Sequence, residues 1–447
     1  MSVIVSDRRT LVVGLGKTGL SCLRYLVDQG RSVAVADSRS APPGLETVQR
    51  DYPDVPVQCG AFDADWFAGF NELVVSPGVS IQTPAIRHAR EHGAVIRGDI
   101  DLFSEAAEAP ILAITGSNGK TTVTTLVGEM ARAAGKRVAV GGNIGTPALE
   151  LLSPEVDVYV LEVSSFQLET TDKLGADVAT VLNVSDDHMD RYPSKMAYFE
   201  AKQRIYNGCR QPVVNLDDAL SIPLARDDLR FLCFGFHRIN PETFSTRDDE
   251  GHLWITYGFD NLIRSDELKL LGTHNLSNVM AALAIGFAAG FPMDTMLQVA
   301  RDFPGLPHRC QRVADIRGVT WVNDSKGTNV GATVAALSSL QPADGRIVLI
   351  AGGDGKGADF SPLVRPVRES CRHLILMGCD AQRLGDALSD IVTVSYVDTM
   401  DEAVSEAARI ACAGDRVLLS PACASLDMYE DYQVRGDAFV RAVEALS

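Results

Sequence analysis

The chain has 447 residues, of which 46% are hydrophobic and 22% are charged, and its formal net charge is −17 because 58 acidic side chains outnumber 41 basic ones. This length is sufficient for about three globular domains of roughly 150 residues each, and the composition is that of a folded protein rather than a disordered one. Nucleic acid and anionic membranes are excluded as expected partners, because both are bound largely by Lys and Arg side chains that contact phosphate.

The first predicted unit is a strand at residues 10–13, a glycine-rich turn at Gly14–Gly19 and a helix that runs through Leu26. A second strand at residues 33–36 leads to Asp37. This order matches the dinucleotide fingerprint, in which a pyrophosphate lies on a helix N-terminus and an acidic side chain lies near a sugar or base. The same geometry suits NAD and the pyrophosphate of a UDP-sugar, so the motif alone leaves the nucleotide open.

A second strand-turn-helix unit, at residues 111–122, is the strongest signal in the sequence. Gly116 and Gly119 let successive backbone N–H groups turn toward one point, which makes an anion cradle at the start of a helix. Lys120 adds a positive charge for the β- and γ-phosphates, and the Thr121 hydroxyl is suited to Mg²⁺. The general phosphate-loop pattern is incomplete, because Ile114 stands in place of its first glycine. A nucleoside triphosphate site is still a better interpretation than an ordinary strand-to-helix turn.

Metal-ligand side chains follow the next two predicted strands. The strand at residues 156–163 carries Glu162 near its end, and the strand at residues 178–182 is followed by a polar segment that contains His188. A carboxylate beside a phosphate loop is where a Mg²⁺ ligand is expected, because hard cations prefer oxygen. Two alternatives stay open: Glu162 could pair with a nearby base, and His188 could be structural.

Two joints divide the chain, one in the polar stretch at residues 97–110 and one in the Pro-Gly-Leu-Pro segment at residues 304–307. After the second joint, a strand at residues 347–350 runs into a glycine-rich turn that carries Lys356, which is either a binding residue or an exposed loop lysine. Apolar strands alternating with helices predict parallel sheets covered by helices, with binding sites at the carboxyl ends of the strands. We therefore expect three α/β domains, at residues 1–98, 99–305 and 306–447.

Together these motifs resemble the Mur ligase family over essentially the whole chain. Besides the phosphate loop, the resemblance is carried by Gly14–Ser21 (GLGKTGLS), Asp187–Tyr192 (DHMDRY) and Ser420–Asp427 (SPACASLD). Within the family, the chain is most similar to members that add D-glutamate to UDP-N-acetylmuramoyl-L-alanine. The resemblance implies a Rossmann-like N-terminal domain for the UDP-substrate, a central P-loop ATPase domain with a parallel sheet, and a Rossmann-like C-terminal domain for the incoming amino acid.

The resemblance also implies roles for individual residues. The implied ATP-binding residues are Gly116, Ser117, Asn118, Gly119, Lys120, Thr121, Thr122, Asn275, Asn278, Arg309, Asp324 and Lys326. Those implied to bind the UDP-substrate are Gly14, Leu15, Gly16, Lys17, Thr18, Asp37, Ser38 and Asn143. D-glutamate would be held by Thr328, Lys356, Ser425 and Leu426, with Tyr432 nearby.

Catalysis by analogy with the family would use ATP and Mg²⁺, with two ions expected. The implied catalytic residues are Lys120, Glu162, His188 and Lys202, and the implied metal ligands are Thr121, Glu162, His188 and Lys202. From the sequence alone, Lys202 is a helix-face lysine that we would expect to be solvated. The resemblance implies instead that Lys202 is carbamylated, which would turn a cation into a carboxylate-like oxygen ligand. ATP would phosphorylate the substrate carboxylate, and the amine of D-glutamate would displace phosphate to form an amide.

Four rival interpretations remain. A folylpolyglutamate synthase-like ligase shares the ATPase core but begins almost at the phosphate loop, and other Mur ligases differ in the amino acid they add. An NAD-binding oxidoreductase would explain Gly14–Gly19 and Asp37 but would leave Lys120 and Thr121 without a role. A non-catalytic nucleotide-binding regulator would not need Glu162.

The expected location is the cytoplasm. The nine cysteines include no CxxC pair, and the N-terminus has no evident secretory signal. The longest apolar stretch, at residues 281–291, is interrupted by Gly286 and Gly290 and is too short to cross a bilayer. We expect a monomer that acts on small molecules.

Overall fold

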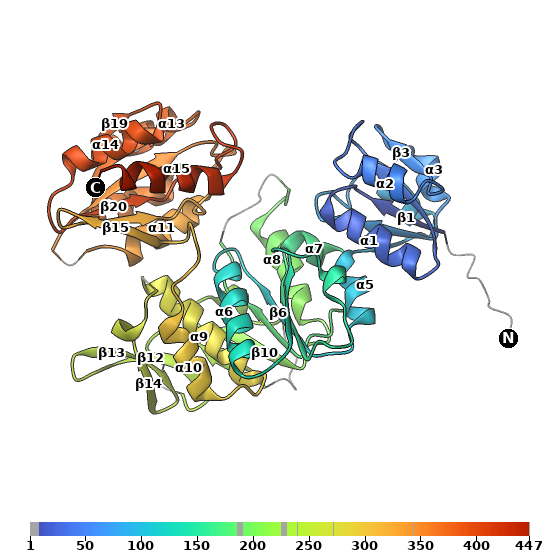
Figure 1. Cartoon of the computed structure of the whole chain (residues 1–447), viewed down its shortest axis with the longest axis horizontal. Coiled ribbons are helices and arrows are strands. Elements are labelled where there is room, and N and C mark those ends of the chain that lie inside the picture. The colour runs from blue at the N-terminus through green and yellow to red at the C-terminus, as the bar shows by residue number, and fades with distance from the viewer. Residues whose placement is uncertain are drawn as a thin grey trace.

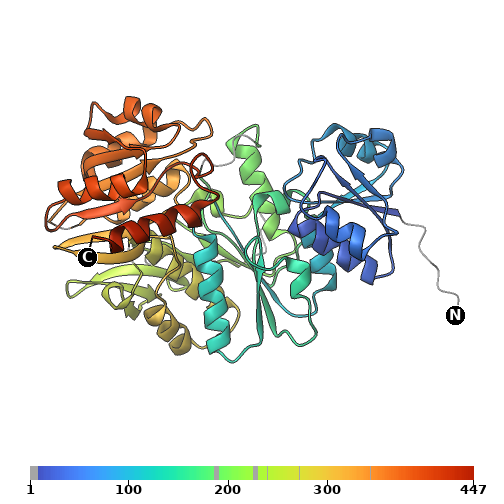
Figure 2. The same cartoon turned by 45° about the horizontal axis from the view of Figure 1, so that its top comes forward.

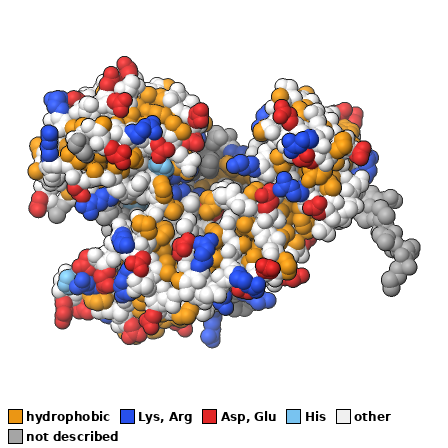
Figure 3. Space-filling view, viewed as in Figure 1, with side chains coloured by type: hydrophobic (Ala, Val, Ile, Leu, Met, Phe, Trp, Pro, Cys, Tyr) orange, Lys and Arg blue, Asp and Glu red, His pale blue; other side chains and the backbone are white. Residues whose placement is uncertain are grey.

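The computed structural model describes residues 9–185, 191–224, 230–238, 240–270, 272–342 and 344–446. Over these residues the chain forms three α/β domains, each built around its own sheet (Figure 1). The central domain lies between the other two in both views of the ribbon (Figure 1, Figure 2). The face seen in Figure 3 is hollowed between the N-terminal and C-terminal domains.

The N-terminal domain has a parallel five-stranded sheet in the order β3-β2-β1-β4-β5. Its central strands are apolar and buried because helices cover both faces. Gly19 is required in α1, since a Cβ there would lie 1.8 Å from the carbonyl oxygen of Gly14. The elements are β1 (Arg9–Val13), α1 (Lys17–Asp28), β2 (Ser32–Asp37), α2 (Leu45–Asp51), β3 (Val57–Cys59), α3 (Ala64–Ala68), β4 (Glu72–Val75), α4 (Pro84–Glu91) and β5 (Val95–Arg97).

The central domain has a nine-stranded sheet in the order β14-β13-β12-β11-β10-β9-β6-β8-β7. Strands β6 to β12 pair in parallel, whereas β12, β13 and β14 pair antiparallel. Its elements before the antiparallel part are α5 (Asp99–Ala106), β6 (Ile111–Thr115), α6 (Lys120–Ala133), β7 (Val138–Gly142), η1 (Ala148–Leu151), β8 (Val158–Glu162), α7 (Ser165–Glu169), β9 (Val178–Val181), α8 (Lys195–Gln203), η2 (Arg204–Tyr206), β10 (Gln211–Asn215), η3 (Ala219–Ser221) and β11 (Leu232–Phe234). Those that follow are β12 (Thr243–Asp249), β13 (His252–Tyr257), β14 (Asp260–Arg264), η4 (Ser265–Glu267), α9 (Thr273–Ala288) and α10 (Met293–Asp302).

The antiparallel extension is a feature that the sequence analysis did not predict. Glu250 and Gly251 connect β12 to β13 with φ values of +50° and +79°, the left-handed conformation of a tight hairpin turn. Elsewhere in the domain, two apolar cores cover the sheet. Helices α6, α9 and α10 pack on one face, and α5, α7 and α8 pack on the other.

The C-terminal domain has a six-stranded sheet in the order β15-β16-β20-β17-β18-β19, parallel except for the β15–β16 pair. Separate apolar clusters cover its two faces. Its elements are β15 (Gln311–Ile316), β16 (Val319–Asn323), α11 (Val330–Ser339), β17 (Ile347–Gly352), η5 (Ser361–Leu363), α12 (Val364–Ser370), β18 (Cys371–Met377), α13 (Ala381–Leu388), β19 (Thr393–Tyr396), α14 (Met400–Ile410), β20 (Arg416–Leu419) and α15 (Tyr432–Glu444).

Each glycine-rich turn found in the sequence follows the carboxyl end of a strand, namely β1, β6 or β17. In α/β sheets this edge is where ligands bind, because the turns and the helix N-termini meet there. The predicted fold class, three α/β domains with parallel-dominated sheets, is confirmed.

Candidate active site

The phosphate loop joins β6 to α6. Gly119 is the N-cap of α6, with φ +83°, and a Cβ there would lie 2.4 Å from Oδ1 of Asn278 on α9. Glycine is therefore required at this position for both its backbone conformation and its lack of a side chain. Asn278 is buried and donates to Oδ1 of Asn275 at 3.0 Å. Asn278, which the resemblance assigns to ATP binding, thus lies directly against the loop.

The other side of the loop is hydrogen-bonded to Asn183, which lies two residues after the end of β9. The backbone N–H of Asn118 donates to Oδ1 of Asn183 at 2.8 Å, and Nδ2 of Asn183 donates to the carbonyl of Asn118 at 3.1 Å. The N–H of Ser117 donates to the carbonyl of Asn183 at 2.9 Å. Two loop N–H groups that the sequence analysis assigned to an anion therefore hold the loop in shape. The first-turn N–H groups of a helix generally have no intrahelical acceptor, and the phosphate contact of those in α6 stays a prediction.

Two lysine side chains meet at this loop. Nζ of Lys120 donates to the carbonyls of Gly116 and Ser117 at 2.7 and 3.0 Å. Nζ of Lys202, on α8, donates to the same Gly116 carbonyl at 2.9 Å and lies 4.5 Å from the ring centre of Tyr198. Lys202 is only 1% exposed, so the expectation of a solvated lysine from sequence alone was wrong. Helix α8 packs against the core next to β6, which is why its inward face reaches the loop.

Glu162 ends β8, level with Ile114 in the parallel pairing with β6, and its side chain is buried. Oε1 accepts from Nδ2 of Asn143 at 2.8 Å. Oε2 is buried, and among the described residues nothing donates to it. A buried carboxylate oxygen without a donor fits a cation ligand, because burying such a group unpaired is unfavourable. Asn143, predicted to bind the UDP-substrate, is held beside this carboxylate.

The predicted metal ligand His188 lies outside the described residues, as do its neighbours at positions 186–190. The structure therefore brings Lys120, Lys202 and Thr121 together around the loop, with Glu162 on the adjacent strand. The metal-binding roles of all four predicted ligands stay predictions.

The C-terminal domain reaches the phosphate loop through Arg309. Nη2 of Arg309 donates to the Thr121 hydroxyl at 2.6 Å, across the boundary between the two domains. Asp324 is buried and braces the segment that bears Arg309, since its Oδ1 accepts from the N–H of Cys310 at 3.2 Å. Burial raises the pKa of Asp324 to about 6, against opposing hydrogen bonds from Ser420 and Cys310. The structure supports Asp324 as a brace for Arg309, and a direct ATP contact stays a prediction.

Backbone strain is present in loops of the C-terminal domain that carry predicted site residues. His308 and Cys310, on either side of Arg309, have φ values of +62° and +49°, and Lys356 and Ala422 have +49° and +60°. Non-glycine residues adopt this region at an energetic cost of about 1–3 kcal/mol each, and such residues cluster at functional sites. The turns that carry Arg309 and Lys356 are thus held in unusual conformations by the surrounding fold.

Most residues predicted to bind D-glutamate lie on loops of the C-terminal domain, whereas Tyr432 begins α15 and contacts Lys326, which is predicted to bind ATP. Nζ of Lys326 lies 3.9 Å from the ring centre of Tyr432. Ser425 is buried, whereas Leu426 is 67% exposed. The N–H of Thr328 donates to the carbonyl of Lys326 at 2.8 Å. Their contacts with an amino acid stay predictions.

Arg435 connects these loops and was not found from the sequence. Arg435 is 2% exposed, and its guanidinium donates to Oγ and the carbonyl oxygen of Ser325, at 3.1 and 2.9 Å. It also donates to the carbonyls of Cys423 and Ala424, at 3.2 and 3.3 Å. Burial lowers the pKa of Arg435 to about 10. One buried side chain on α15 therefore joins the segments that carry Lys326 and Ser425, and no local sequence signal marks it.

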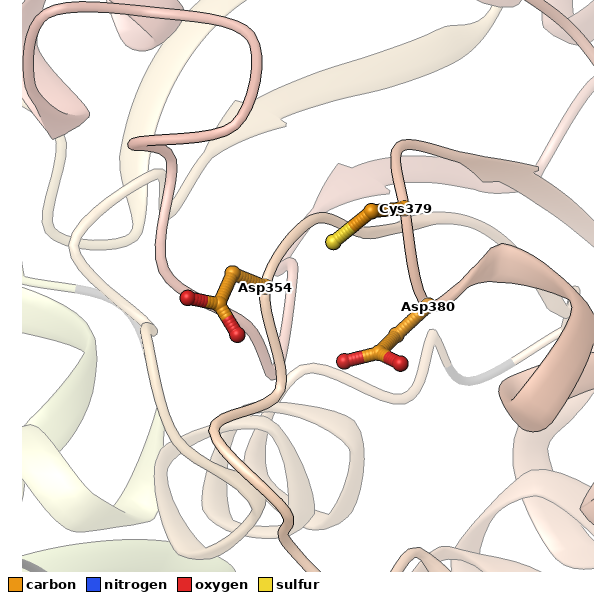
Figure 4. A group of neighbouring side chains, drawn as sticks. All are labelled: Asp354, Cys379 and Asp380. Carbon is orange, nitrogen blue, oxygen red and sulfur yellow. The ribbon is translucent and has the colours of Figure 1, made fainter.

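Asp354, Cys379 and Asp380 gather at the carboxyl ends of β17 and β18, with Cys379 and Asp380 directed toward Asp354 (Figure 4). Both carboxylates are already engaged. Oδ1 of Asp354 accepts from the N–H of Lys356 at 2.8 Å, and Oδ2 of Asp380 accepts from the N–H of Gly355 at 2.8 Å. The group therefore shapes the turn that presents Lys356.

In the N-terminal domain, Asp37 organises the glycine-rich turn. Its Oδ2 accepts from the N–H of Leu15 at 2.7 Å, and Arg39 binds both carboxylate oxygens. Burial alone would raise the pKa of Asp37, but the hydrogen bonds from Arg39 and Leu15 lower it to about 2. Gly14 has φ +98°, and a Cβ there would lie 2.9 Å from Cβ of Ser76. The turn is thus compact and backed by a second loop, and its predicted contacts with the UDP-substrate are not tested.

Among the described residues, no helix has the length and apolar character needed to cross a membrane.

Comparison with known proteins defines the class. Three family models match in succession: the Mur ligase MurD-like N-terminal domain over residues 8–98, the Mur ligase middle domain over 114–286, and the Mur ligase glutamate ligase domain over 308–423. The chain belongs to the Mur ligase family, as its motifs indicated.

Relatives of high identity narrow this further. The chain is 67% identical over 446 residues to the UDP-N-acetylmuramoylalanine–D-glutamate ligase of Marinobacter nauticus, a match that covers 100% of both chains. It is 53% identical over 448 residues to the ligase of the same name from Pseudomonas aeruginosa, again with 100% of both chains covered.

Solved structures share the fold at low identity. A pseudomurein peptide ligase type C from Methanothermus fervidus superposes with a TM-score of 0.63 at 17% identity, covering 99% of this chain and 100% of that one. The UDP-N-acetylmuramate-alanine ligase of Thermotoga maritima gives 0.59 at 17% identity, covering 98% and 100%. At this identity, the likeness concerns the fold alone.

Proposed function

We propose that this chain is an ATP-dependent ligase that joins D-glutamate to UDP-N-acetylmuramoyl-L-alanine in the synthesis of peptidoglycan precursors. The observation that carries the chemistry is the meeting of Lys120 and Lys202 at the Gly116 carbonyl. The substrates are those named for relatives that match the full length at up to 67% identity.

The reaction requires activation because oxide is a very poor leaving group from a free carboxylate. The alanyl carboxylate attacks the γ-phosphorus of ATP, and the bond between this phosphorus and the oxygen that bridges it to the β-phosphate breaks. ADP departs, and the substrate carboxylate has become an acyl phosphate. The amine of D-glutamate then attacks the acyl carbon. A tetrahedral intermediate collapses, phosphate departs with the bonding electrons, and the amine loses a proton to give the amide.

The chain's own groups mainly position and neutralise charge, as in other phosphoryl transfers. Nζ of Lys120 donates to the loop carbonyls, and rotation of this side chain would bring it to the phosphates. The first-turn N–H groups of α6 would bind phosphate oxygens. Arg309 contacts Thr121 at 2.6 Å and so brings a cation of the C-terminal domain beside the loop, in addition to the lysines of the central domain.

Mg²⁺ is a metal that these residues fit, because Glu162 offers a buried oxygen without a donor among the described residues. We propose Glu162, Thr121, His188 and a carbamylated Lys202 as the ligands of two ions. Bound there, the ions would neutralise charge on the triphosphate and the incoming carboxylate. Carbamylation would add CO₂ to the Lys202 amine with release of a proton.

The remaining assignments extend the proposal to the outer domains. The turn at Gly14–Thr18, with Asp37, Ser38 and Asn143, would hold the UDP-substrate. Thr328, Lys356, Ser425, Leu426 and Tyr432 would hold D-glutamate. We propose domain boundaries at residues 1–98, 99–305 and 306–447, a monomeric state and a cytoplasmic location.

The test is phosphate release from ATP in the presence of UDP-N-acetylmuramoyl-L-alanine, with D-glutamate, L-glutamate, L-alanine or meso-diaminopimelate added in turn. We expect release with D-glutamate alone, and none from a Lys120→Ala variant. Release with a different amino acid would keep the ligase class and overturn the substrate. Absence of release with any of them would overturn the ligase proposal.

The carbamylation of Lys202 is tested separately by ¹³C NMR after incubation with labelled bicarbonate. We expect a carbamate signal in the parent protein and no such signal in the Lys202→Arg variant.

A further inference from the structure

Arg191 crosses the boundary between the central and N-terminal domains. Its Nη1 donates to the carbonyl of Pro77 at 3.0 Å, and its Nη2 donates to the carbonyl of Val79 at 3.3 Å. Both acceptors lie in the loop that follows β4 of the N-terminal domain. The guanidinium thus binds a loop that is more than one hundred residues away in the sequence.

The central domain holds Arg191 firmly from the other side. Nη2 also donates to Oε2 of Glu169 at 2.8 Å, and the two side chains are only 14% and 13% exposed. The guanidinium carbon lies 4.5 Å from the ring centre of Phe166. Phe166 and Glu169 are both on α7, and α7 starts three residues after Glu162. Arg191 is therefore fixed to the part of the central domain that adjoins the candidate metal ligand.

The loop that Arg191 binds supports the glycine-rich turn of the N-terminal domain. Oγ of Ser76 donates to the carbonyl of Gly14 at 3.1 Å, and the N–H of Ser76 donates to the carbonyl of Val13 at 2.9 Å. A Cβ on Gly19 would lie 3.0 Å from the same Oγ. The position of this loop therefore determines the shape of the turn proposed to hold the UDP-substrate.

We propose that Arg191 is a positioning residue that fixes the UDP-substrate turn relative to the ATP site. It does so by binding the Ser76–Val79 loop on one side and α7 on the other. This inference rests on the proposed function, in which the carboxylate of the UDP-substrate must meet the γ-phosphate bound by the central domain. Because a misplacement of about 1 Å can reduce such a reaction about a hundredfold, the relative position of the two domains matters for the rate.

The chemistry of the contact requires arginine. A planar guanidinium offers several N–H donors in fixed directions, so it can bind two carbonyls and a carboxylate at once while stacking on an aromatic ring. An ammonium group is a point charge that cannot reproduce this arrangement. Removal of the guanidinium would also leave the largely buried Glu169 without this partner.

An exposed ion pair between the same two domains provides a control. Nη1 of Arg24, on α1, lies 3.2 Å from Oε1 of Glu150 on η1, but these side chains are 51% and 35% exposed. Exposed pairs contribute about 0–1 kcal/mol. Arg24→Ala therefore removes an arginine from the same boundary without disturbing the Ser76–Val79 loop.

The experiment measures steady-state kinetics of Arg191→Ala, Arg191→Lys, Glu169→Gln and Arg24→Ala, with each substrate varied in turn, together with thermal unfolding. For Arg191→Ala we expect KM for the UDP-substrate to rise at least tenfold and kcat to fall, while KM for ATP changes less than about twofold. Arg191→Lys should recover part of the loss, Glu169→Gln should give a smaller change of the same pattern, and Arg24→Ala should be within twofold of the parent for every substrate.

A purely stabilising role for Arg191 would lower the unfolding temperature and the active fraction, hence kcat, while all KM values stayed unchanged. That result would overturn the inference and leave the ligase function standing. If Arg191→Ala does not fold, Arg191→Lys and Glu169→Gln decide the question by the same KM comparison. An inactive parent enzyme would overturn the proposed function itself. In that case calorimetry of UDP binding tests the inference. We expect Arg191→Ala to bind UDP more weakly than Arg24→Ala does. Equal binding by the two variants would overturn the inference.

Discussion

Asn183 and Asn118 are joined by a reciprocal pair of hydrogen bonds, of 2.8 Å from the Asn118 N–H to Oδ1 and 3.1 Å from Nδ2 to the Asn118 carbonyl. The side-chain amide of Asn183 thus pairs with both the backbone N–H and the backbone carbonyl of Asn118. This pairing fixes the phosphate loop to the end of the neighbouring strand, and such preorganisation reduces the free energy needed to order the loop on binding.

Asn183→Ala should therefore weaken ATP binding. Loss of the two hydrogen bonds leaves polar backbone groups without partners. An unfavourable effect of about 1.4 kcal/mol, within the range for such groups, corresponds to a rise of about tenfold in KM for ATP. Steady-state kinetics with ATP varied checks this. Asn207→Ala is the control, because Asn207 also donates its side-chain amide to a backbone carbonyl, that of Asp172, away from the loop. An unchanged KM for ATP in Asn183→Ala would contradict the role of the pair.

Gly119→Ala should destabilise the protein and abolish ATP-dependent activity. The added Cβ meets Oδ1 of Asn278 at 2.4 Å, and φ is +83°. Gly135, just after the end of the same helix, has φ +77°, and no atom lies within 4 Å of the position that a Cβ would take there, so Gly135→Ala isolates the conformational part. Urea unfolding should give about 1 kcal/mol for Gly135→Ala and more for Gly119→Ala. Equal losses in the two variants would show that the contact with Asn278 is unimportant.

Arg435→Met should destabilise the C-terminal domain and raise KM for D-glutamate. The guanidinium donates to the carbonyls of Ser325, Cys423 and Ala424, and each buried carbonyl that loses its donor is unfavourable by about 1–3 kcal/mol. Thermal unfolding and kinetics with D-glutamate varied check the two effects. Arg409→Met, which removes a surface pair with Glu406 on α14, should change neither. A stable Arg435→Met enzyme with the parental KM would refute the assignment.

Asp99 should make stability depend on pH between about 4 and 6. Burial raises its pKa from 3.8 to about 6, against hydrogen bonds led by that from Gln167. The folded state then binds more protons than the unfolded state in this window, so stability decreases as pH rises through it and the full penalty is present above pH 6. The shift corresponds to about 3 kcal/mol.

Asp99→Asn removes this charge while keeping an oxygen that accepts from Gln167. We expect the variant to be more stable than the parent at pH 8, with the advantage falling toward zero near pH 4, as measured by urea unfolding at several pH values. Asp157 is the control with a pKa shift of opposite sign. Its carboxylate is paired with Arg137 at the surface, and the hydrogen bonds from Arg137 lower its pKa to about 2. Asp157→Asn should give no gain at pH 8. A gain for Asp99→Asn that is the same at pH 4 and pH 8 would exclude titration of Asp99 as its cause.

The glycine turns, the phosphate loop and the family were readable from the sequence because their signals are local. A strand, a turn that needs glycine and the first turn of a helix are neighbours in the chain, so residues 10–19 and 111–122 carry the whole pattern. The strand predicted at residues 10–13 appears in the structure as β1, Arg9–Val13, and the second unit begins with β6, Ile111–Thr115. The hairpins β12–β14 were not predicted, although Gly251 and Gly258 in their short turns are a local hairpin signal.

The tertiary structure decided the contacts between residues that are far apart in the chain. Lys202 is buried against a carbonyl 86 positions earlier, and Arg309 reaches a hydroxyl 188 positions earlier. Asn183 and Arg435 carry no sequence pattern of their own. Arg191 lies in the DHMDRY motif, but the motif does not indicate that its guanidinium binds a loop of the N-terminal domain. The sequence by itself determined the turns and the type of chemistry, since backbone conformation and phosphate binding depend on adjacent residues. Which side chains support those turns was decided only by packing, since that depends on the relative position of three separate sheets.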